Sequence, residues 1–206
     1  MHQKEFTIFV NSQLHGAEWP KEACAVVPKD VFGTQKPFVV RSQFHGKHSE
    51  QDLIQELEHY LEENRDVLPT ERPVSLKLFL NYSPCYDCSC RLRRFIDDCE
   101  STYDLEISLE VVFSGIYNIS RPSCKRGECG IDHIRNDVEE NITGLKSLIQ
   151  RGATLRSFEK RDWRELASIL ELSEEFAKEA IEKREKEDIC MQQDLQKLLP
   201  GPSFGR

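Results

Sequence analysis

The chain has 206 residues, of which 38% are hydrophobic and 31% are charged. This length favours one domain over two, since domains commonly hold about 100–200 residues. The composition excludes both a disordered tail and an integral membrane protein. The 28 basic and 36 acidic residues leave a formal charge of −8, which at first argues against a nucleic-acid partner.

The negative charge is concentrated in two segments. Residues 50–66 hold seven acids and one base, and residues 171–188 hold eight acids and four bases, so the rest of the chain carries +2. Both segments have helical apolar spacing, which places their acids on the solvated sides of two amphipathic helices. Three basic stretches, 19–49, 114–128 and 151–164, are expected to converge on a nucleic-acid cleft.

The predicted elements alternate between strands and helices. β-Branched and aromatic residues at 23–27 and 37–44 predict a hairpin. Apolar spacing then predicts, in order, a helix over about 49–65, a strand at 76–80, a helix with Ser83 as N-cap, a strand over about 105–113, a helix around 142–149, a strand at 153–158, a helix from 163 and a long helix over about 173–199. This alternation predicts an α/β fold with a central sheet flanked by helices.

The expected compartment is the cytoplasm or the nucleus. No apolar run approaches the ~20 residues that a membrane helix needs, so no membrane partner is expected. The five largely apolar residues before Asn11 are too few for the core of a signal peptide. In a reducing compartment, the eight cysteines are expected to be thiols or metal ligands rather than disulfides.

Two short motifs point to chemistry. His48, Ser49 and Glu50 form HxE at one predicted helix start, and residues 84–88 form PCxxC at the next. Together they are the signature of zinc nucleobase deaminases. A lone CxxC would also fit a redox pair or a structural metal site, but the combination favours catalysis and leaves a non-catalytic zinc fold as the alternative.

The residue types suit a catalytic metal site. Cys85 and Cys88 share one face of a helix start, where the helix dipole favours thiolates. With His48 they make three ligands for Zn²⁺ and leave the fourth tetrahedral position for water. Glu50 is then the predicted catalytic residue, which carries protons from that water to a ring nitrogen and to the departing amine.

Over about residues 20–170, the chain resembles the AID/APOBEC family of polynucleotide cytidine deaminases, as a divergent branch. The resemblance rests on His48-Ser49-Glu50, on the run from Tyr82 to Cys88, and on the run from Gly144 to Phe158. It implies a single cytidine-deaminase-like domain over residues 1–206: a three-layer α/β/α fold with a five-stranded mixed sheet, about six helices and a long closing helix at 173–199. It also implies one catalytic Zn²⁺ and the hydrolytic deamination of cytosine to uracil in single-stranded nucleic acid, with DNA favoured over RNA.

The resemblance also implies four substrate-binding residues. The Ser49 backbone N–H would bind the base carbonyl, and the Ser83 backbone carbonyl would bind the exocyclic amine. Tyr82 stands where the family usually has Trp beside the pocket. Tyr117 is similar to the loop aromatic that stacks on the target base or its 5′ neighbour, a contact worth about 1–3 kcal/mol in single-strand binders.

The chain departs from the family pattern in two places. Residues 24–47 contain no Asn to hold the target sugar, and Thr34 or Gln35 is the expected substitute. The loop after the fourth strand carries Cys124, Cys129 and His133. These three residues could form a second zinc site, but free thiols are favoured because no fourth ligand is evident.

Two other functions stay open from the sequence. The first is a deaminase of free cytidine or deoxycytidine nucleotide. The second is a catalytically silent, zinc-containing protein that binds nucleic acid, although a structural zinc site has no use for Glu50. The biological role that the family resemblance implies is immune diversification, defence against invading nucleic acid or transcript editing.

Overall fold

The computed structural model describes residues 2–14, 20–43, 48–69, 73–119, 121–123 and 136–199. Five strands form one mixed sheet in the order β2-β1-β3-β4-β5. β1 (Glu22–Val27) is antiparallel to both β2 (Phe38–Gln43) and β3 (Val74–Leu80). β4 (Ile107–Phe113) and β5 (Thr154–Ser157) continue the sheet in parallel with β3.

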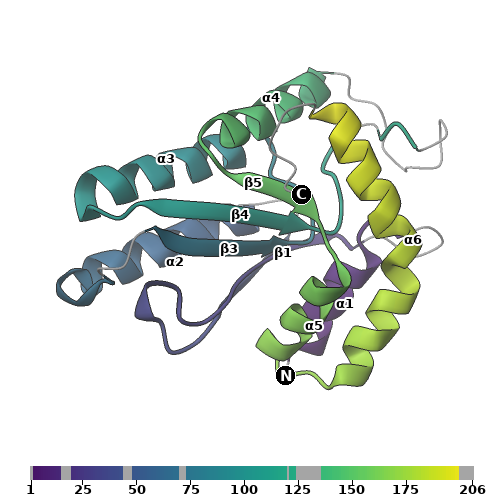
Figure 1. Cartoon of the computed structure of the whole chain (residues 1–206), viewed down its shortest axis with the longest axis horizontal. Coiled ribbons are helices and arrows are strands. Elements are labelled where there is room, and N and C mark those ends of the chain that lie inside the picture. The colour runs from purple at the N-terminus through teal and green to yellow at the C-terminus, as the bar shows by residue number, and fades with distance from the viewer. Residues whose placement is uncertain are drawn as a thin grey trace.

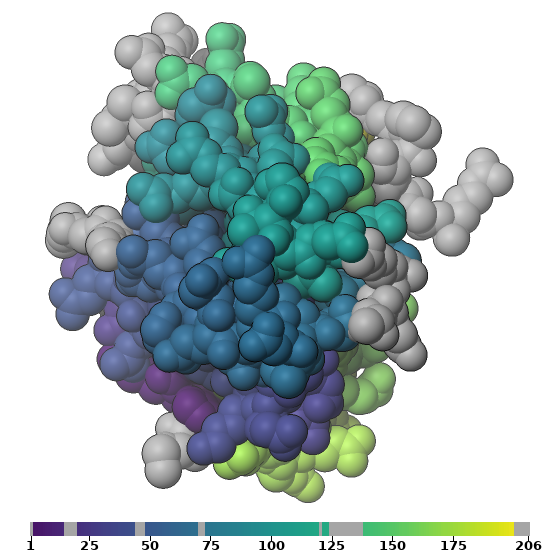
Figure 2. Space-filling model, turned by 90° about the vertical axis from the view of Figure 1, so that its left-hand side faces the viewer, coloured from purple at the N-terminus to yellow at the C-terminus, as the bar shows by residue number. Residues whose placement is uncertain are grey.

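Helices cover both faces of the sheet (Figure 1). The described helices are α1 (Gln3–Asn11), α2 (Ser49–Glu63), α3 (Tyr86–Tyr103), α4 (Asn136–Gln150), α5 (Lys160–Ile169) and α6 (Glu174–Leu198). α2, α3 and α4 lie on one face, whereas α1, α5 and the first half of α6 lie on the other. The second half of α6 contributes Met191 and Leu195 to the cluster of α2, α3 and α4. Figure 2 views the end of the molecule at which β3 and β4 begin, where blue and teal segments from the middle of the chain form the centre. The predicted α/β class, with a five-stranded mixed sheet and about six helices, is confirmed.

The central strand β3 divides the core between the two helical layers. Leu76, Leu78 and Leu80 belong to the cluster on the α2 and α3 side, whereas Phe79 belongs to the cluster with α1, α5 and α6. All four side chains are at most 1% exposed. This two-sided burial follows from the alternation of side chains along a strand, and it confirms the strand predicted from these residues.

The first helix, α1, is missing from the sequence-based prediction. Phe6, Phe9 and Val10 have the i, i+3, i+4 spacing of a helix face, and all three are buried. Phe6 makes edge-to-face contacts with Trp163 of α5 and Phe176 of α6, at ring distances of 6.0 and 6.4 Å. A nine-residue helix is marginal by itself, so these tertiary contacts stabilise it.

The two acidic segments are largely solvated, as predicted, but not throughout. In α2, Glu50 is an exception, with 6% exposure. In α6, Arg184 and Asp188 are buried, and the Arg184 guanidinium donates to the Asp188 carboxylate at 2.8 Å. The Trp163 indole donates to the same carboxylate, also at 2.8 Å. No helix in the described part of the chain is long and apolar enough to span a membrane.

A buried ion network joins α5 to the sheet. The Asp162 carboxylate accepts hydrogen bonds from Lys77 of β3 and Arg156 of β5, each at 2.8 Å. Burial by itself would raise the pKa of Asp162, but its bonds to these two cations hold the pKa below the usual value. The ionised carboxylate is therefore part of the native fold.

Gly144 allows α4 to pack tightly against α3. A Cβ at this position would lie 2.9 Å from the Tyr86 Cα and 3.0 Å from the Ser89 side chain. The Asn141 side chain accepts a hydrogen bond from the Tyr86 backbone N–H at 2.8 Å at the same junction. α4 thus holds the start of α3, the helix that carries the predicted cysteine ligands.

Candidate metal centre and pocket

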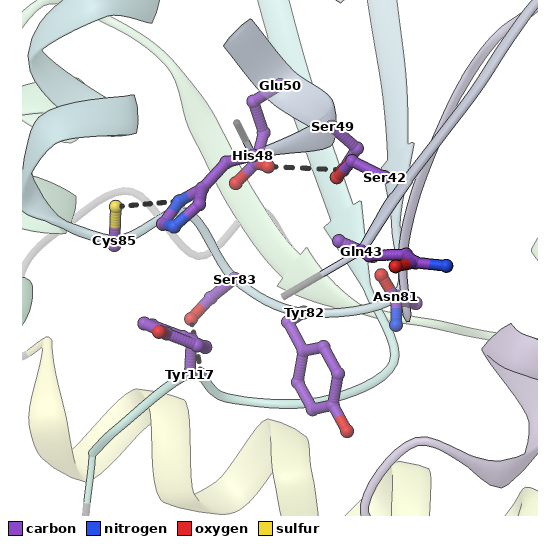
Figure 3. A pocket seen from close by; sticks show the side chains of 11 residues that line it. Ser42, Gln43, His48, Ser49, Glu50, Asn81, Tyr82, Ser83, Cys85 and Tyr117 are labelled. Carbon is purple, nitrogen blue, oxygen red and sulfur yellow. Dashed lines mark hydrogen bonds between the residues drawn. The ribbon is translucent and has the colours of Figure 1, made fainter. Parts of the chain in front are cut away.

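The candidate site lies where the first turns of α2 and α3 face each other (Figure 3). His48 is the N-cap of α2, with Ser49 and Glu50 in the first turn. Cys85 is the N-cap of α3, and its Sγ accepts a hydrogen bond from the Cys88 backbone N–H at 3.5 Å. Both motifs therefore stand at helix starts, as the sequence predicts.

The three predicted metal ligands come together. The His48 Nδ1 atom lies 3.3 Å from the Cys85 Sγ and 3.2 Å from the Cys88 Sγ. One ligand atom from each residue fits within a mutual distance of 4.8 Å. Adjacent N and S ligands of a tetrahedral zinc ion lie about 3.5 Å apart, given Zn–N of about 2.0–2.1 Å and Zn–S of about 2.3 Å. The donor set and its spacing therefore fit Zn²⁺.

The electrostatics of the cysteine pair favour metal binding. The hydrogen bond from the Cys88 thiol lowers the pKa of Cys85 to about 4, and the neighbouring His48 lowers it further against the opposing effect of burial. The same sharing of a proton raises the pKa of Cys88. The hydrogen bond to Cys85 also raises the pKa of His48. These shifts favour the thiolate form of Cys85, and thiolate is the form that binds zinc.

The other described cysteines do not take part in the site. Cys24, Cys90, Cys99 and Cys190 are free thiols, as are the two predicted ligands. Burial raises the pKa of Cys99 to about 12, so this thiol is chemically inert at neutral pH. The expectation of thiols rather than disulfides is confirmed for the six described cysteines.

Glu50 is buried beside the metal ligands. Burial raises the pKa of its carboxyl group, and a hydrogen bond from the Ser49 hydroxyl at 3.2 Å partly offsets that effect. Among the described residues that line the pocket, it is the only carboxylate. A carboxyl group whose pKa is shifted towards neutrality can both accept and release a proton, as a general acid–base catalyst must.

The predicted substrate-binding residues all line the same pocket. Ser49, Tyr82, Ser83 and Tyr117 surround it together with His48, Glu50 and Cys85. Figure 3 shows the rings of Tyr82 and Tyr117 on one side of the pocket, below His48. The Tyr117 ring centre lies 6.0 Å from that of His48 and 6.4 Å from that of Tyr82, both edge to face. The structure therefore brings the predicted site residues together, while their individual roles stay predictions.

The predicted N-cap of α3 is wrong by two residues. Cys85 occupies that position, and the Ser83 hydroxyl instead accepts a hydrogen bond from the Tyr117 backbone N–H at 2.9 Å. The Ser83 backbone N–H also donates to the Gly115 carbonyl at 2.8 Å. Ser83 thus joins two loops of the pocket rather than starting the helix.

Several lining residues were missed by sequence reasoning. They are Ala23, Ser42, Gln43 and Asn81. Gln43 ends β2 only five residues before His48, which is the signal that could have identified it. The suggested sugar-binding substitutes are not supported, since Thr34 is buried and neither Thr34 nor Gln35 is among the described residues that line the pocket. Gln43, in contrast, has an exposed side chain and lines the pocket.

The expected convergence of basic stretches on the cleft is not met by 151–164, none of whose residues line the pocket. Parts of the other two stretches, 19–49 and 114–128, lie outside the described residues. In the stretch 151–164, four cations form ion pairs with nearby acids: Arg151 with Asp97 and Glu100, Arg156 with Glu110 and Asp162, Lys160 with Glu185, and Arg161 with Glu159. Arg121 is buried against Asp194 of α6, at 2.9 Å. These cations are paired with acids, and none of them lines the pocket. The residues of the suggested second zinc site, Cys124, Cys129 and His133, lie outside the described residues.

Comparisons with known proteins bear on the fold alone. No protein-family model matches the chain, and no curated protein matches it. Among solved structures, it is similar to the crystal structure of a C-terminal deletion mutant of Rib2 deaminase from Aspergillus oryzae. That likeness covers 94% of this chain and 99% of the other, at 14% identity and a TM-score of 0.37. With a TM-score this low, the fold assignment rests on the strand order and layers described above.

Proposed function

We propose that the protein is a zinc-dependent deaminase that hydrolyses cytosine to uracil in single-stranded DNA or RNA. The observation that carries this proposal is the buried carboxyl group of Glu50 beside the His48, Cys85 and Cys88 donors. A purely structural zinc site needs four protein ligands and no neighbouring carboxylate. A three-ligand site with an adjacent acid–base group suits hydrolysis at an amino-substituted ring carbon.

The chain's own residues supply the rest of the chemistry. When bound, Zn²⁺ acts as a Lewis acid that lowers the pKa of a water molecule from about 15.7 towards 7. Glu50 accepts one proton from the attacking water and delivers it to the ring nitrogen. It then accepts the remaining proton, from the hydroxyl group added at the ring carbon, and delivers it to the departing amine, which leaves as ammonia. The Ser49 hydroxyl, at 3.2 Å, holds the Glu50 carboxylate in place.

The pocket wall supports recognition of a pyrimidine ring. Two Tyr rings lie on one side of it, and the backbone groups of Ser49 and Ser83 lie close to the metal ligands. We assign Tyr117 to stacking on the base or its 5′ neighbour. Ser49 N–H would bind the base carbonyl, and the Ser83 carbonyl would bind the amine. These roles follow the AID/APOBEC resemblance of residues 48–50 and 82–88, which also favours DNA over RNA.

A second candidate is the deamination of free cytidine or its nucleotide. The described pocket wall consists mainly of uncharged Ser, Gln, Asn and Tyr side chains. Such a wall suits the sugar and base of a free nucleoside, which carry no charge.

The six free thiols accord with a reducing compartment, so we also propose a cytoplasmic or nuclear location.

The deciding experiment compares these substrates. Zinc-loaded protein is incubated with randomised single-stranded DNA, with the matching RNA, and with cytidine and its mono-, di- and triphosphates. Sequencing detects cytosine-to-uracil conversion in the strands, and chromatography detects uridine products. Conversion in the strands supports the polynucleotide proposal, conversion of free substrates alone selects the second candidate, and no conversion of any substrate would refute both.

A further inference from the structure

The turn that follows α1 contacts the loop after β4, which carries Tyr117 of the pocket. The Gln13 side-chain amide donates to the Ile116 backbone carbonyl at 2.6 Å and accepts from the Ile116 backbone N–H at 2.8 Å. Gln13 is 6% exposed, and Ile116 is fully buried. The amide thus pairs with both backbone groups of the residue directly before Tyr117.

Gln13 is held in an uncommon backbone conformation. Its φ angle is 51°, in the left-handed region that residues other than Gly seldom adopt. Such a conformation is strained and persists only where the surroundings determine it. The two hydrogen bonds to Ile116 are surroundings of this kind, so the turn and the loop after β4 hold each other in place.

The loop that Gln13 holds is joined to the loop before α3. Ser83 bonds to both Gly115 and Tyr117, as described above. A Cβ on Gly115 would lie 2.8 Å from the Tyr82 ring, so the two loops are in close contact. A displacement of residues 114–117 would therefore move both aromatic rings of the pocket.

The residue before Gln13 contacts the other side of the same wall. The Asn81 side chain donates to the Ser12 hydroxyl at 3.1 Å. The Arg184 guanidinium, fully buried in α6, donates to the backbone carbonyls of Ser12 and Ser114, each at 2.5 Å. The turn at residues 12–13 is thus hydrogen-bonded to the loop after β4, to the loop before α3 and to α6.

We infer that Gln13 is a positioning residue that sets how tightly the pocket binds the pyrimidine base, by fixing the loop that carries Tyr117. The inference rests on the proposed deaminase function. Glu50 and the metal ligands stand on α2 and α3, whereas both hydrogen bonds of the Gln13 side chain go to the loop after β4. Loss of these bonds should therefore weaken substrate binding and leave proton transfer largely intact.

The test uses Gln13→Met, which keeps the length of the side chain but removes both hydrogen bonds. The matched control is Gln192→Met, since Gln192 accepts a hydrogen bond from the Ser157 backbone N–H at the end of β5. The full-length, zinc-loaded proteins are compared by hydrogen exchange with mass spectrometry and by steady-state kinetics. The substrate is a single-stranded oligodeoxynucleotide with one cytosine, or cytidine if the wild type accepts only that.

We expect Gln13→Met to speed amide exchange in residues 114–119 and to raise KM about tenfold, within the range produced by loss of a base-stacking contact. We expect kcat to stay within about twofold of the wild type, because the acid–base group is untouched. Gln192→Met should change neither the exchange of 114–119 nor KM.

The outcomes separate this inference from the proposed function. Unchanged exchange in 114–119 overturns the positioning role, whatever the activity. Faster exchange with an unchanged KM, or a loss confined to kcat, overturns it as well. If the wild type converts no cytosine substrate, the proposed function fails, and the inferred effect on base binding fails with it, even where exchange shows that Gln13 holds the loop.

Discussion

Replacement of Glu50 by Gln tests the central chemical claim. The amide has nearly the same size as the carboxyl group and can still accept the hydrogen bond from the Ser49 hydroxyl, which measures 3.2 Å. It cannot accept and release a proton at neutral pH. Because Glu50 is the only carboxylate among the described residues that line the pocket, no described neighbour can replace it.

The expected loss follows from that isolation. Positioned general acid–base groups contribute about 10²–10⁴-fold to rate, which corresponds to about 2.7–5.5 kcal/mol of transition-state stabilisation. We expect Glu50→Gln to lower kcat by about 10²–10⁴-fold and to change KM little. The control is Glu56→Gln, the same substitution at an exposed position of the same helix, which should keep wild-type activity.

The assay follows cytosine conversion in an oligonucleotide by uracil excision and strand cleavage, with zinc content measured in parallel. Wild type and both variants should hold about one zinc ion per chain, since neither Glu is among the three ligands. Activity of Glu50→Gln within about tenfold of the wild type would refute the acid–base role. A loss of zinc in this variant would show that the carboxylate acts on the metal instead.

Three further substitutions test the metal site and the fold. Cys85→Ser should lower zinc content, measured by mass spectrometry, from about one ion per chain to near zero, whereas Cys90→Ser on the exposed side of the same helix should not. Asp162→Asn should lower the free energy of unfolding in urea at pH 7 by about 1–3 kcal/mol, because it removes a buried carboxylate from Lys77 and Arg156, which keep only Glu165 and Glu110 as carboxylate partners. The folded-state pKa of Asp162 is lowered, so its contribution to the unfolding free energy is complete above the unfolded-state pKa of about 3.9 and is lost as pH falls through the folded-state pKa. The difference in unfolding free energy between the wild type and Asp162→Asn should therefore be smaller below about pH 4 than at pH 7. Gly144→Ala should also lower the unfolding free energy, by about 1–3 kcal/mol, although Ala normally favours a helix, because its Cβ would meet the Tyr86 backbone at 2.9 Å.

Each of these predictions has a clear contrary result. Full zinc content in Cys85→Ser would remove that thiolate from the ligand set. Equal unfolding free energies for the wild type and Asp162→Asn, both at pH 7 and below about pH 4, would show that the ionised carboxylate makes no net contribution to stability. A more stable Gly144→Ala variant would mean that α3 and α4 can separate slightly at no cost.

Local patterns in the sequence determined most of the elements. Side-chain alternation and helical spacing depend on neighbouring residues, so the hairpin, the buried strand β3 and the helices α2 and α6 were predicted near their observed bounds. The helices α3 and α5 were predicted with starts that differ by about two and three residues, respectively, and α4 begins at Asn136, six residues before the predicted start. The helix α1 was missed, although Phe6, Phe9 and Val10 have helical spacing. A nine-residue helix gains its stability from packing against α5 and α6, and that packing is not visible in its own residues.

The metal centre was predictable for a similar reason. HxE and CxxC each place their functional side chains within one helix turn. Once the two helix starts face each other, His48, Cys85 and Cys88 form one candidate metal site. The electrostatic expectation was less successful, because Arg151 and Arg156 find acidic partners that lie far away in the sequence. Net charge per segment says nothing of which charges are already paired.

The sequence alone therefore predicted the fold class, the three candidate zinc ligands and the candidate acid–base residue, all of which depend on local spacing. Only the tertiary structure decided what surrounds them. It placed Gln43 at the pocket, paired Lys160 of α5 with Glu185 of α6, and brought Gln13 against the backbone of Ile116, 103 positions away. Contacts of that separation arise from packing of the two helical layers on one sheet, which no local pattern records.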